Sequence, residues 1–139
     1  MQVQPYLTFY GRCDEALEFY QSKLGAEVLF KMRFGDAPKD MPACAPEHVD
    51  KIMHVSFKIG SSIVMASDGD MSKPASYSGF SLSIAPDDVA SGEKLFKGLA
   101  EGGEIGMPWQ ETFWALGFGM VTDKFGVHWM VNVERPQQQ

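Results

Sequence analysis

The sequence predicts an α+β fold in which one unit, a strand followed by a helix and three further strands, occurs twice. Several segments alternate between apolar and polar residues, which is typical of half-buried strands. Two other segments carry apolar residues three and four positions apart, which is typical of amphipathic helices. The elements follow in the same order in both halves, and the first strands begin at Val3 and Gly79. This repeated order indicates an internal duplication.

The length and charge of the chain exclude several classes of protein. Its 139 residues (15.4 kDa) suffice for one domain or for two small units that share a core. The net charge of −6 offers no basic surplus for binding nucleic acid. No apolar run approaches the roughly 20 residues of a membrane span, and we expect no signal peptide. Cys13 and Cys44 fit no metal or redox motif, so we expect free thiols and a cytoplasmic location.

The first half is predicted to contain four strands and one helix. The helix has Lys23 in its last turn, as the helix dipole favours, and Gly25 is expected to end it. A loop over 35–50 and a solvated turn containing Asp68 and Asp70 interrupt the pattern. The expected elements are the strands Val3–Tyr10, Ala26–Phe34, Ile52–Ile59 and Ser62–Ala66 and the helix Asp14–Leu24.

The second half is predicted to repeat this order. Asp87 or Asp88 is the expected N-cap of its helix, and Gly102 and Gly103 are expected to end that helix. Residues 123–126 form the expected turn between the last two strands. The expected elements are the strands Gly79–Ile84, Glu104–Trp109, Leu116–Thr122 and Val127–Glu134 and the helix Asp87–Glu101, whose apolar stripe contains Val89, Leu95, Phe96 and Leu99.

The alternation within the strands also predicts which side chains face a helix. In Ile52–Ile59, the residues expected to pack under the helix are Met53, Val55, Phe57 and Ile59. In the first strand, Val3, Leu7 and Phe9 are expected to face the core. The residues expected on the opposite face are Gln4, Tyr6, Thr8, His54, Ser56 and Lys58 in the first half and Ser81, Ser83 and His128 in the second.

Four segments carry a resemblance to a known family. They are the two long stretches Tyr6–Gly25 and Glu111–Asn132 and the two short ones Met53–Val55 and Val64–Asp68. In these segments the chain resembles the PhnB-like branch of the vicinal oxygen chelate superfamily. This superfamily includes glyoxalase I, extradiol dioxygenases, fosfomycin-modifying enzymes and bleomycin-binding proteins. The likeness covers residues 3–134.

The resemblance implies a specific architecture. The two βαβββ units are expected to form a U-shaped, eight-stranded sheet with helices on the convex side and a small-molecule ligand in the concave cleft. Residues 1–139 are expected to be a single glyoxalase-like domain, with one repeat at about 3–67, the other at about 79–134 and a frayed tail at 135–139. Relatives often pair units from different chains, so a homodimer is expected.

Relatives with this fold often hold one divalent metal ion in the cleft, bound by His, Glu or Gln from four positions. The resemblance places these positions at Gln4, His54, Gly79 and Met130. Glycine offers no side-chain ligand, and a thioether suits soft ions rather than the hard or borderline ions of these enzymes. His54 is therefore the only strong candidate ligand. No full metal site is expected, and no cofactor is predicted.

Three side chains are the main candidates for chemistry or ring binding. His54 is either a metal ligand or general base, or a structural histidine. His128 either forms a two-histidine pocket with His54 or is an exposed strand end. Trp114 is expected at the mouth of the cleft, where its ring would stack on a flat ligand. Phe118 and Trp129 are expected in the core.

These observations leave three functions open. The first is a small-molecule-binding protein, or an enzyme with an incomplete metal site, in which His54 is the catalytic candidate. The second is a resistance-type protein that sequesters a planar cationic compound, which the acidic surplus, Trp109 and Trp114 would suit. The third is a metal-dependent lyase or dioxygenase with ligands from the loops. The candidate ligand-binding residues are Gln4, Tyr6, Ser56, Ser81, Trp114 and His128.

Overall fold

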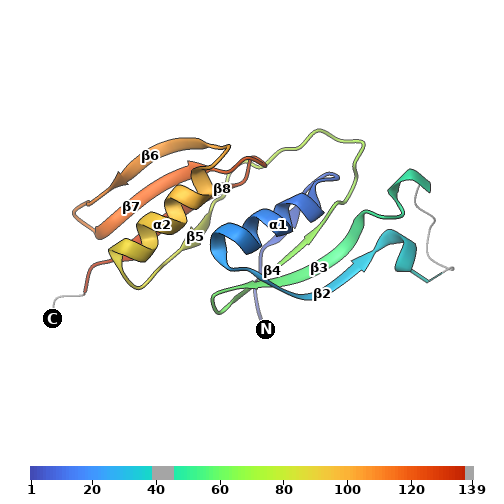
Figure 1. Ribbon diagram of the computed structural model, residues 1–139, viewed down its shortest axis with the longest axis horizontal. Coiled ribbons are helices and arrows are strands. Elements are labelled where there is room, and N and C mark those ends of the chain that lie inside the picture. Colours follow the sequence, from blue (N-terminus) through green and yellow to red (C-terminus); the bar gives the residue numbers. More distant parts are fainter. Residues whose placement is uncertain (39–45, 137–139) are drawn as a thin grey trace. The chain divides into compact units, whose positions relative to one another are not determined.

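The computed structural model describes residues 1–38 and 46–136, which belong to two compact units, Met1–Ala75 and Ser76–Gln139 (Figure 1). Within the described residues, each unit contains one α-helix and one four-stranded mixed sheet. The predicted α+β class and the repeated order of strand, helix and three strands are confirmed. No helix in the described part of the chain is long and apolar enough to span a membrane.

The first unit is a mixed sheet that carries one helix. Its elements are β1 (Tyr6–Thr8), α1 (Cys13–Leu24), β2 (Glu27–Arg33), β3 (Ile52–Ile59) and β4 (Ser62–Ser67), with the short 3₁₀ helices η1 (Phe34–Asp36) and η2 (Pro46–His48). The strands lie in the order β1-β4-β3-β2. β1 runs parallel to β4, and the other neighbouring strands are antiparallel.

One face of this sheet is buried against α1. The rings of Tyr20 and Phe57 stack with their centroids 6.2 Å apart, and both side chains are fully buried. Val55 lies on the same face of β3 and is also fully buried. Gly25 ends α1 in the left-handed conformation, with a φ of 67°, which glycine adopts at little cost. The predicted face is confirmed for Val55 and Phe57, and the predicted end of the helix is confirmed. At the start of β3, Ile52 is fully buried and Met53 only partly so, where the register with β2 shifts.

A buried carboxylate ties the elements of the first unit together. Asp68 directly follows β4, and its Oδ1 accepts hydrogen bonds from the backbone N–H groups of Gly11 (2.9 Å) and Cys13 (2.8 Å). Its Oδ2 accepts one from the N–H of Ile52 (2.8 Å). One side chain thus holds the turn after β1, the start of α1 and the start of β3. The expectation of a solvated turn is wrong for Asp68, since this residue is 1% exposed.

The second unit has the same architecture. Its elements are β5 (Leu82–Ile84), α2 (Val89–Ala100), β6 (Glu104–Gln110), β7 (Ala115–Thr122) and β8 (His128–Glu134). The strand order β5-β8-β7-β6 matches the first unit strand for strand, and β5 is again parallel to its neighbour. Figure 1 shows α2 lying along one face of this sheet. The N-cap Asp88 accepts a hydrogen bond from the N–H of Ser91 at 2.7 Å.

Glycines make room for large rings between α2 and its sheet. Phe96 is buried against Gly119, and the ring of Trp109 lies against Gly92 and Gly117. A Cβ atom at Gly117 would come within 2.3 Å of that ring, so a larger residue does not fit without movement. Trp109 therefore packs on the α2 side of the sheet and is not available for ligand stacking on the opposite face.

A second buried carboxylate organises the turn between β7 and β8. Asp123 is 3% exposed, and its Oδ1 accepts hydrogen bonds from the N–H groups of Phe125 (2.9 Å) and Val127 (3.0 Å). Its Oδ2 accepts one from the indole Nε1–H of Trp129 at 2.8 Å. The predicted turn and the predicted core position of Trp129 are confirmed, because that ring is 3% exposed.

The first strand of each unit is shorter than predicted. β1 begins at Tyr6 rather than Val3, and Val3 is 96% exposed. β5 begins at Leu82 rather than Gly79. Among residues 1–38 and 46–136, each of these strands pairs with the last strand of its own unit alone, and this parallel pairing covers three residues in both cases. The predicted core position of Val3 is therefore wrong, and Gln4 and Gly79 lie outside the strands.

The remaining predictions concern loops and the second helix. η1 and η2 occupy parts of the loop predicted over 35–50. Cys44 in that loop and residues 137–139 of the tail lie outside the described residues. In α2, Leu99 is buried as predicted, but Val89 is 38% exposed because it is the first residue of the helix and stands at the edge of the buried stripe.

Replacing Asp68 with alanine is expected to destabilise the chain strongly. The variant leaves three backbone N–H groups without their carboxylate partner, and each buried unpaired group costs about 1–3 kcal/mol. We therefore expect the free energy of unfolding, measured by urea denaturation, to fall by about 3 kcal/mol or more. Asp70→Ala is the matched control, because Asp70 is exposed and bonds to the neighbouring Ser72. Equal losses in the two variants would contradict the role of Asp68.

Candidate functional site

The helix-free face of the first unit's sheet holds several of the predicted site residues. One row of side chains runs across β1, β4, β3 and β2, and it consists of Tyr6, Met65, Ser56 and Phe30. Tyr6 is 50% exposed and Phe30 is 52% exposed, so two aromatic rings on this face are open to solvent. This face lies opposite Phe57, which packs against α1.

Tyr6 and His54 form a polar pair on the helix-free face of the first unit. The Tyr6 hydroxyl oxygen lies 3.0 Å from Nδ1 of the imidazole. Partial burial raises the pKa of Tyr6, so the hydroxyl keeps its proton at neutral pH. A protonated hydroxyl can donate to Nδ1 or accept from an Nδ1–H group, so this bond fits either tautomer of the imidazole. The described residues provide no hydrogen-bond partner for Nε2, which leaves this nitrogen open on the helix-free face.

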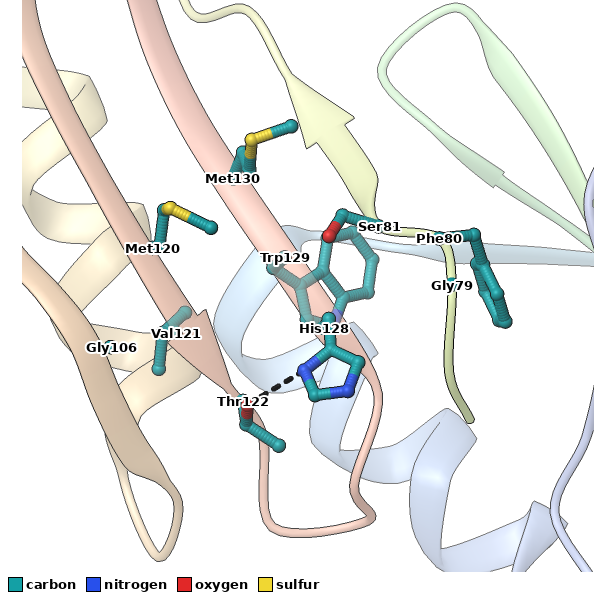
Figure 2. A pocket seen from close by; sticks show the side chains of 10 residues that line it. All are labelled: Gly79, Phe80, Ser81, Gly106, Met120, Val121, Thr122, His128, Trp129 and Met130. Carbon is teal, nitrogen blue, oxygen red and sulfur yellow. Dashed lines mark hydrogen bonds between the residues drawn. The ribbon is translucent and has the colours of Figure 1, made fainter. Parts of the chain in front are cut away.

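A hollow of about 490 Å³ lies on the helix-free face of the second unit's sheet (Figure 2). Its volume is typical of sites that bind small organic molecules. The face is assigned from alternation. Val121 and Trp129 also border the hollow, but their side chains are buried on the α2 side, so the alternate residues of β7 and β8 face away from α2. The side chains that line the hollow include Phe80, Ser81, Met120, Thr122, His128 and Met130.

Two methionines form the apolar floor of the hollow. Met120 of β7 is directly paired with Met130 of β8, and Figure 2 shows both thioether side chains on the same side of the sheet. Unbranched thioether side chains adapt their shape to a ligand and make favourable contacts with aromatic rings. Sequence reasoning missed Met120, Phe80 and Thr122. The alternation of β7 places Met120 and Thr122 on one face and could have indicated both.

Two hydrogen bonds lock His128 into the wall of the hollow. Its Nε2–H donates to the backbone carbonyl of Tyr77 at 2.9 Å, so Nδ1 accepts from the Thr122 hydroxyl at 2.8 Å (dashed line in Figure 2). With both ring nitrogens engaged, the neutral imidazole has no free lone pair for a metal ion. The alternative of an exposed strand end is wrong, because the ring is partly buried.

An aromatic cluster stands at the start of β7. Trp114 immediately precedes this strand, and its ring packs edge-to-face against Phe118, with centroids 5.3 Å apart, and against Phe113, at 4.8 Å. Trp114 is 44% exposed, whereas Phe118 is 8% exposed. The predicted burial of Phe118 is confirmed, but it is buried on the helix-free face. The ring of Trp114 offers surface on which a flat ligand can stack.

The four positions that related folds use for a divalent metal do not carry a matching donor set. Gly79 has no side chain, and Met130 offers only a thioether. Gln4 precedes β1, and its amide donates a hydrogen bond to Oε1 of Gln2 at 3.1 Å. His54 is the one strong ligand type among the four, and a single imidazole does not make a metal site. Among the described residues, no cluster of three or more His, Cys, Asp or Glu side chains could hold a metal ion, so these residues do not fit the metal.

The chain matches known proteins over nearly its whole length. Residues 1–132 match the family model described as 3-demethylubiquinone-9 3-methyltransferase. Protein YjdN from Escherichia coli (strain K12) is 46% identical over 144 residues, which cover 99% of this chain and 98% of YjdN. Protein PA1353 from Pseudomonas aeruginosa is 44% identical, and its crystal structure gives a TM-score of 0.85 over 98% of this chain and 99% of that one. At 23% identity, a putative 3-demethylubiquinone-9 3-methyltransferase, PhnB protein, from Bacillus cereus shares the fold, with a TM-score of 0.78 over 96% of this chain and 99% of that one.

Two substitutions on opposite faces of β3 are expected to differ in their effect on stability. His54→Ala should lower the free energy of unfolding by less than about 1 kcal/mol, because it removes one hydrogen bond on a partly exposed face. Phe57→Ala should lower it by about 3–5 kcal/mol, because it opens a cavity beneath Tyr20. Thermal unfolding of both variants measures the difference. A larger loss for His54→Ala than for Phe57→Ala would show that the faces are assigned the wrong way round.

Proposed function

We propose that this chain, which belongs to the PhnB-like family described as 3-demethylubiquinone-9 3-methyltransferase, binds a small organic molecule that contains an apolar ring. Its fold is that of the glyoxalase/bleomycin resistance/dioxygenase superfamily.

The proposed binding site is the hollow on the helix-free face of the second unit. The observation that carries the proposal is a cavity of about 490 Å³ that two adjacent methionines line.

The lining of the hollow combines apolar surface with a few polar groups. Met120 and Met130 supply the apolar surface, and Phe80 borders the hollow with a ring that is 46% exposed and points away from the methionines in Figure 2. Contacts between a thioether and an aromatic ring contribute about 0.3–1.5 kcal/mol each. Ser81 and Thr122 supply hydroxyl groups. This combination favours an uncharged ring-containing ligand over a strongly charged one.

The start of each helix is already capped by a carboxylate. Nucleotide cofactors commonly place a phosphate on the free N–H groups at a helix N-terminus. In this chain, Asp68 accepts the N–H of Cys13 at the start of α1, and Asp88 accepts the N–H of Ser91 in the first turn of α2. These contacts occupy one N–H group at the start of each helix. The proposal concerns binding alone and does not extend the methyl transfer in the family description to this chain.

A second candidate function rests on the Tyr6–His54 pair of the first unit. The open Nε2 of the imidazole lies next to two half-exposed rings, Tyr6 and Phe30, with ring centroids 5.6 Å and 6.2 Å from that of His54. A histidine with one open ring nitrogen can exchange a proton or a hydrogen bond with a bound ligand. In this proposal, His54 is the catalytic residue and Ser56 contacts the same ligand. Recovery of a bound compound unchanged would instead indicate a sequestering protein.

Met120→Glu is expected to weaken ring binding by at least about tenfold, because it places a carboxylate on the apolar floor. The probe is 2-naphthol, and isothermal titration calorimetry measures its affinity. Val89→Glu is the matched control, because Val89 is 38% exposed, Met120 is 36% exposed, and Val89 lies on α2, away from the lining residues. Equal affinities for the two variants, or no binding of 2-naphthol to the unmodified chain, would contradict the proposal.

We also propose that the chain forms a homodimer in the cytoplasm. The edge strands β2 and β6 carry exposed apolar side chains, Leu29 (49%) and Ile105 (51%), and an uncovered sheet edge favours pairing with another chain. Cys13 is a buried free thiol, and burial raises the pKa of that thiol, so the group stays a protonated, unreactive thiol. A free thiol supports a reducing compartment.

Multi-angle light scattering is expected to give a mass about twice 15.4 kDa at micromolar concentration. Leu29→Lys tests the edge of β2, because a charge at an edge strand opposes pairing. A mass of 15.4 kDa for the unmodified chain at every concentration tested would rule out the dimer.

A further inference from the structure

The side chain of Asn132 carries a buried oxygen without a hydrogen-bond partner. Its Oδ1 is closed to solvent, and the described residues provide no donor for it. By contrast, the buried carboxylates of Asp68 and Asp123 each accept three hydrogen bonds. Leaving a buried acceptor unpaired costs about 1–3 kcal/mol, so such an atom in a native protein calls for an explanation.

Asn132 lies on the same face of the sheet as the hollow. Its neighbours in β8, Val131 and Val133, are buried on the α2 side, so alternation turns Asn132 to the opposite face. On that face, the preceding residue of β8 is Met130, which lines the hollow and lies roughly 7 Å along the strand. Across the strands, Asn132 pairs with Phe118 of β7. The pair Phe118–Asn132 is therefore the next pair on this face after Met120–Met130, the methionine floor.

Trp114 packs beside the cross-strand partner of Asn132 and is half-exposed. Its ring packs edge-to-face on Phe118, the cross-strand partner of Asn132. Trp114 precedes β7 and is 44% exposed, so its ring can turn outward without breaking a hydrogen bond between strands. Because the Asn132 oxygen is closed to solvent, a ligand reaches it only when a neighbouring ring turns away in this manner.

We propose that Asn132 is a binding residue whose Oδ1 accepts a hydrogen bond from a hydroxyl or N–H group on the ligand ring. The inference rests on the proposed function and narrows the ligand to a ring molecule with a donor substituent, such as a phenol. The ring lies over Met120 and Met130, and the donor group reaches Asn132 when Trp114 turns. A ligand without the donor leaves the acceptor unpaired, and a site of this kind discriminates against it.

Two matched probes test this assignment on the unmodified chain. In 2-methoxynaphthalene, a methyl group replaces the hydroxyl proton of 2-naphthol, so the ring stays and the donor is lost. Asn132 is the one asparagine of the sequence, and ¹⁵N-asparagine labelling therefore gives a single side-chain amide signal. We expect 2-naphthol to bind about tenfold more tightly than 2-methoxynaphthalene and to shift that signal, together with the indole signal of Trp114.

The variant Asn132→Leu separates binding from folding. It should lower the affinity for 2-naphthol about tenfold and leave that for 2-methoxynaphthalene unchanged. It should not lower the melting temperature, because the oxygen it removes has no partner in the folded chain. Equal affinities of the unmodified chain for the two probes would overturn the role of Asn132. The partner of its oxygen would then be a water molecule rather than a ligand. Failure of both probes to bind would overturn this inference and the proposed function together.

Discussion

Each four-stranded sheet buries only one of its faces under its single helix, and this constraint sorts the side chains of every strand into two groups. On the helix side, Val55 and Phe57 of β3 and Val131 of β8 are fully buried and hold the core together. On the other side, the same two strands carry His54 and Asn132. Most residues on this second face pack less tightly than the core, so this face can carry binding groups, although Phe118 and the Asn132 oxygen are buried there. The candidate sites therefore follow from the way each unit forms its core.

The two units also share a way of fixing the chain where strands begin and end. Asp68 and Asp123 are buried carboxylates that each accept three hydrogen bonds from N–H groups. A charged acceptor with several N–H partners forms strong hydrogen bonds, and it holds turns that would otherwise expose unpaired backbone groups. In the second unit, the turn that Asp123 organises leads directly into His128, whose ring is held in the lining of the hollow by two hydrogen bonds. These carboxylates are therefore structural, and the amide of Asn132 differs from them because its oxygen is unpaired.

Local pattern predicted the elements well where pairing and packing agree with it. The alternation over Ile52–Ile59 gave the bounds of β3 and the faces of Val55 and Phe57, where both neighbouring strands pair with β3. It failed at Ile52, which is fully buried where the register with β2 shifts. The lengths of β1 and β5 depend on parallel pairing with a strand distant in sequence, which no local pattern reports. The burial of Asp68 was missed for the same reason, since an Asp-Gly-Asp segment also suits a solvated turn. The hydrogen bond from His128 to Tyr77 joins residues 51 positions apart, and the unpaired oxygen of Asn132 has no sequence signal at all.

The central claim is that the methionine floor of the second unit is a binding surface for an aromatic ring. The chain contains nine methionines, and ¹³C-methyl labelling gives each of them one signal. During titration with 2-naphthol, ring currents move the methyl signals of groups that lie under the bound ring. The account predicts large, saturable shifts for Met120 and Met130 and little change for Met53 of β3. Saturable shifts confined to methionines of the first unit, with Met120 and Met130 unmoved, would contradict it.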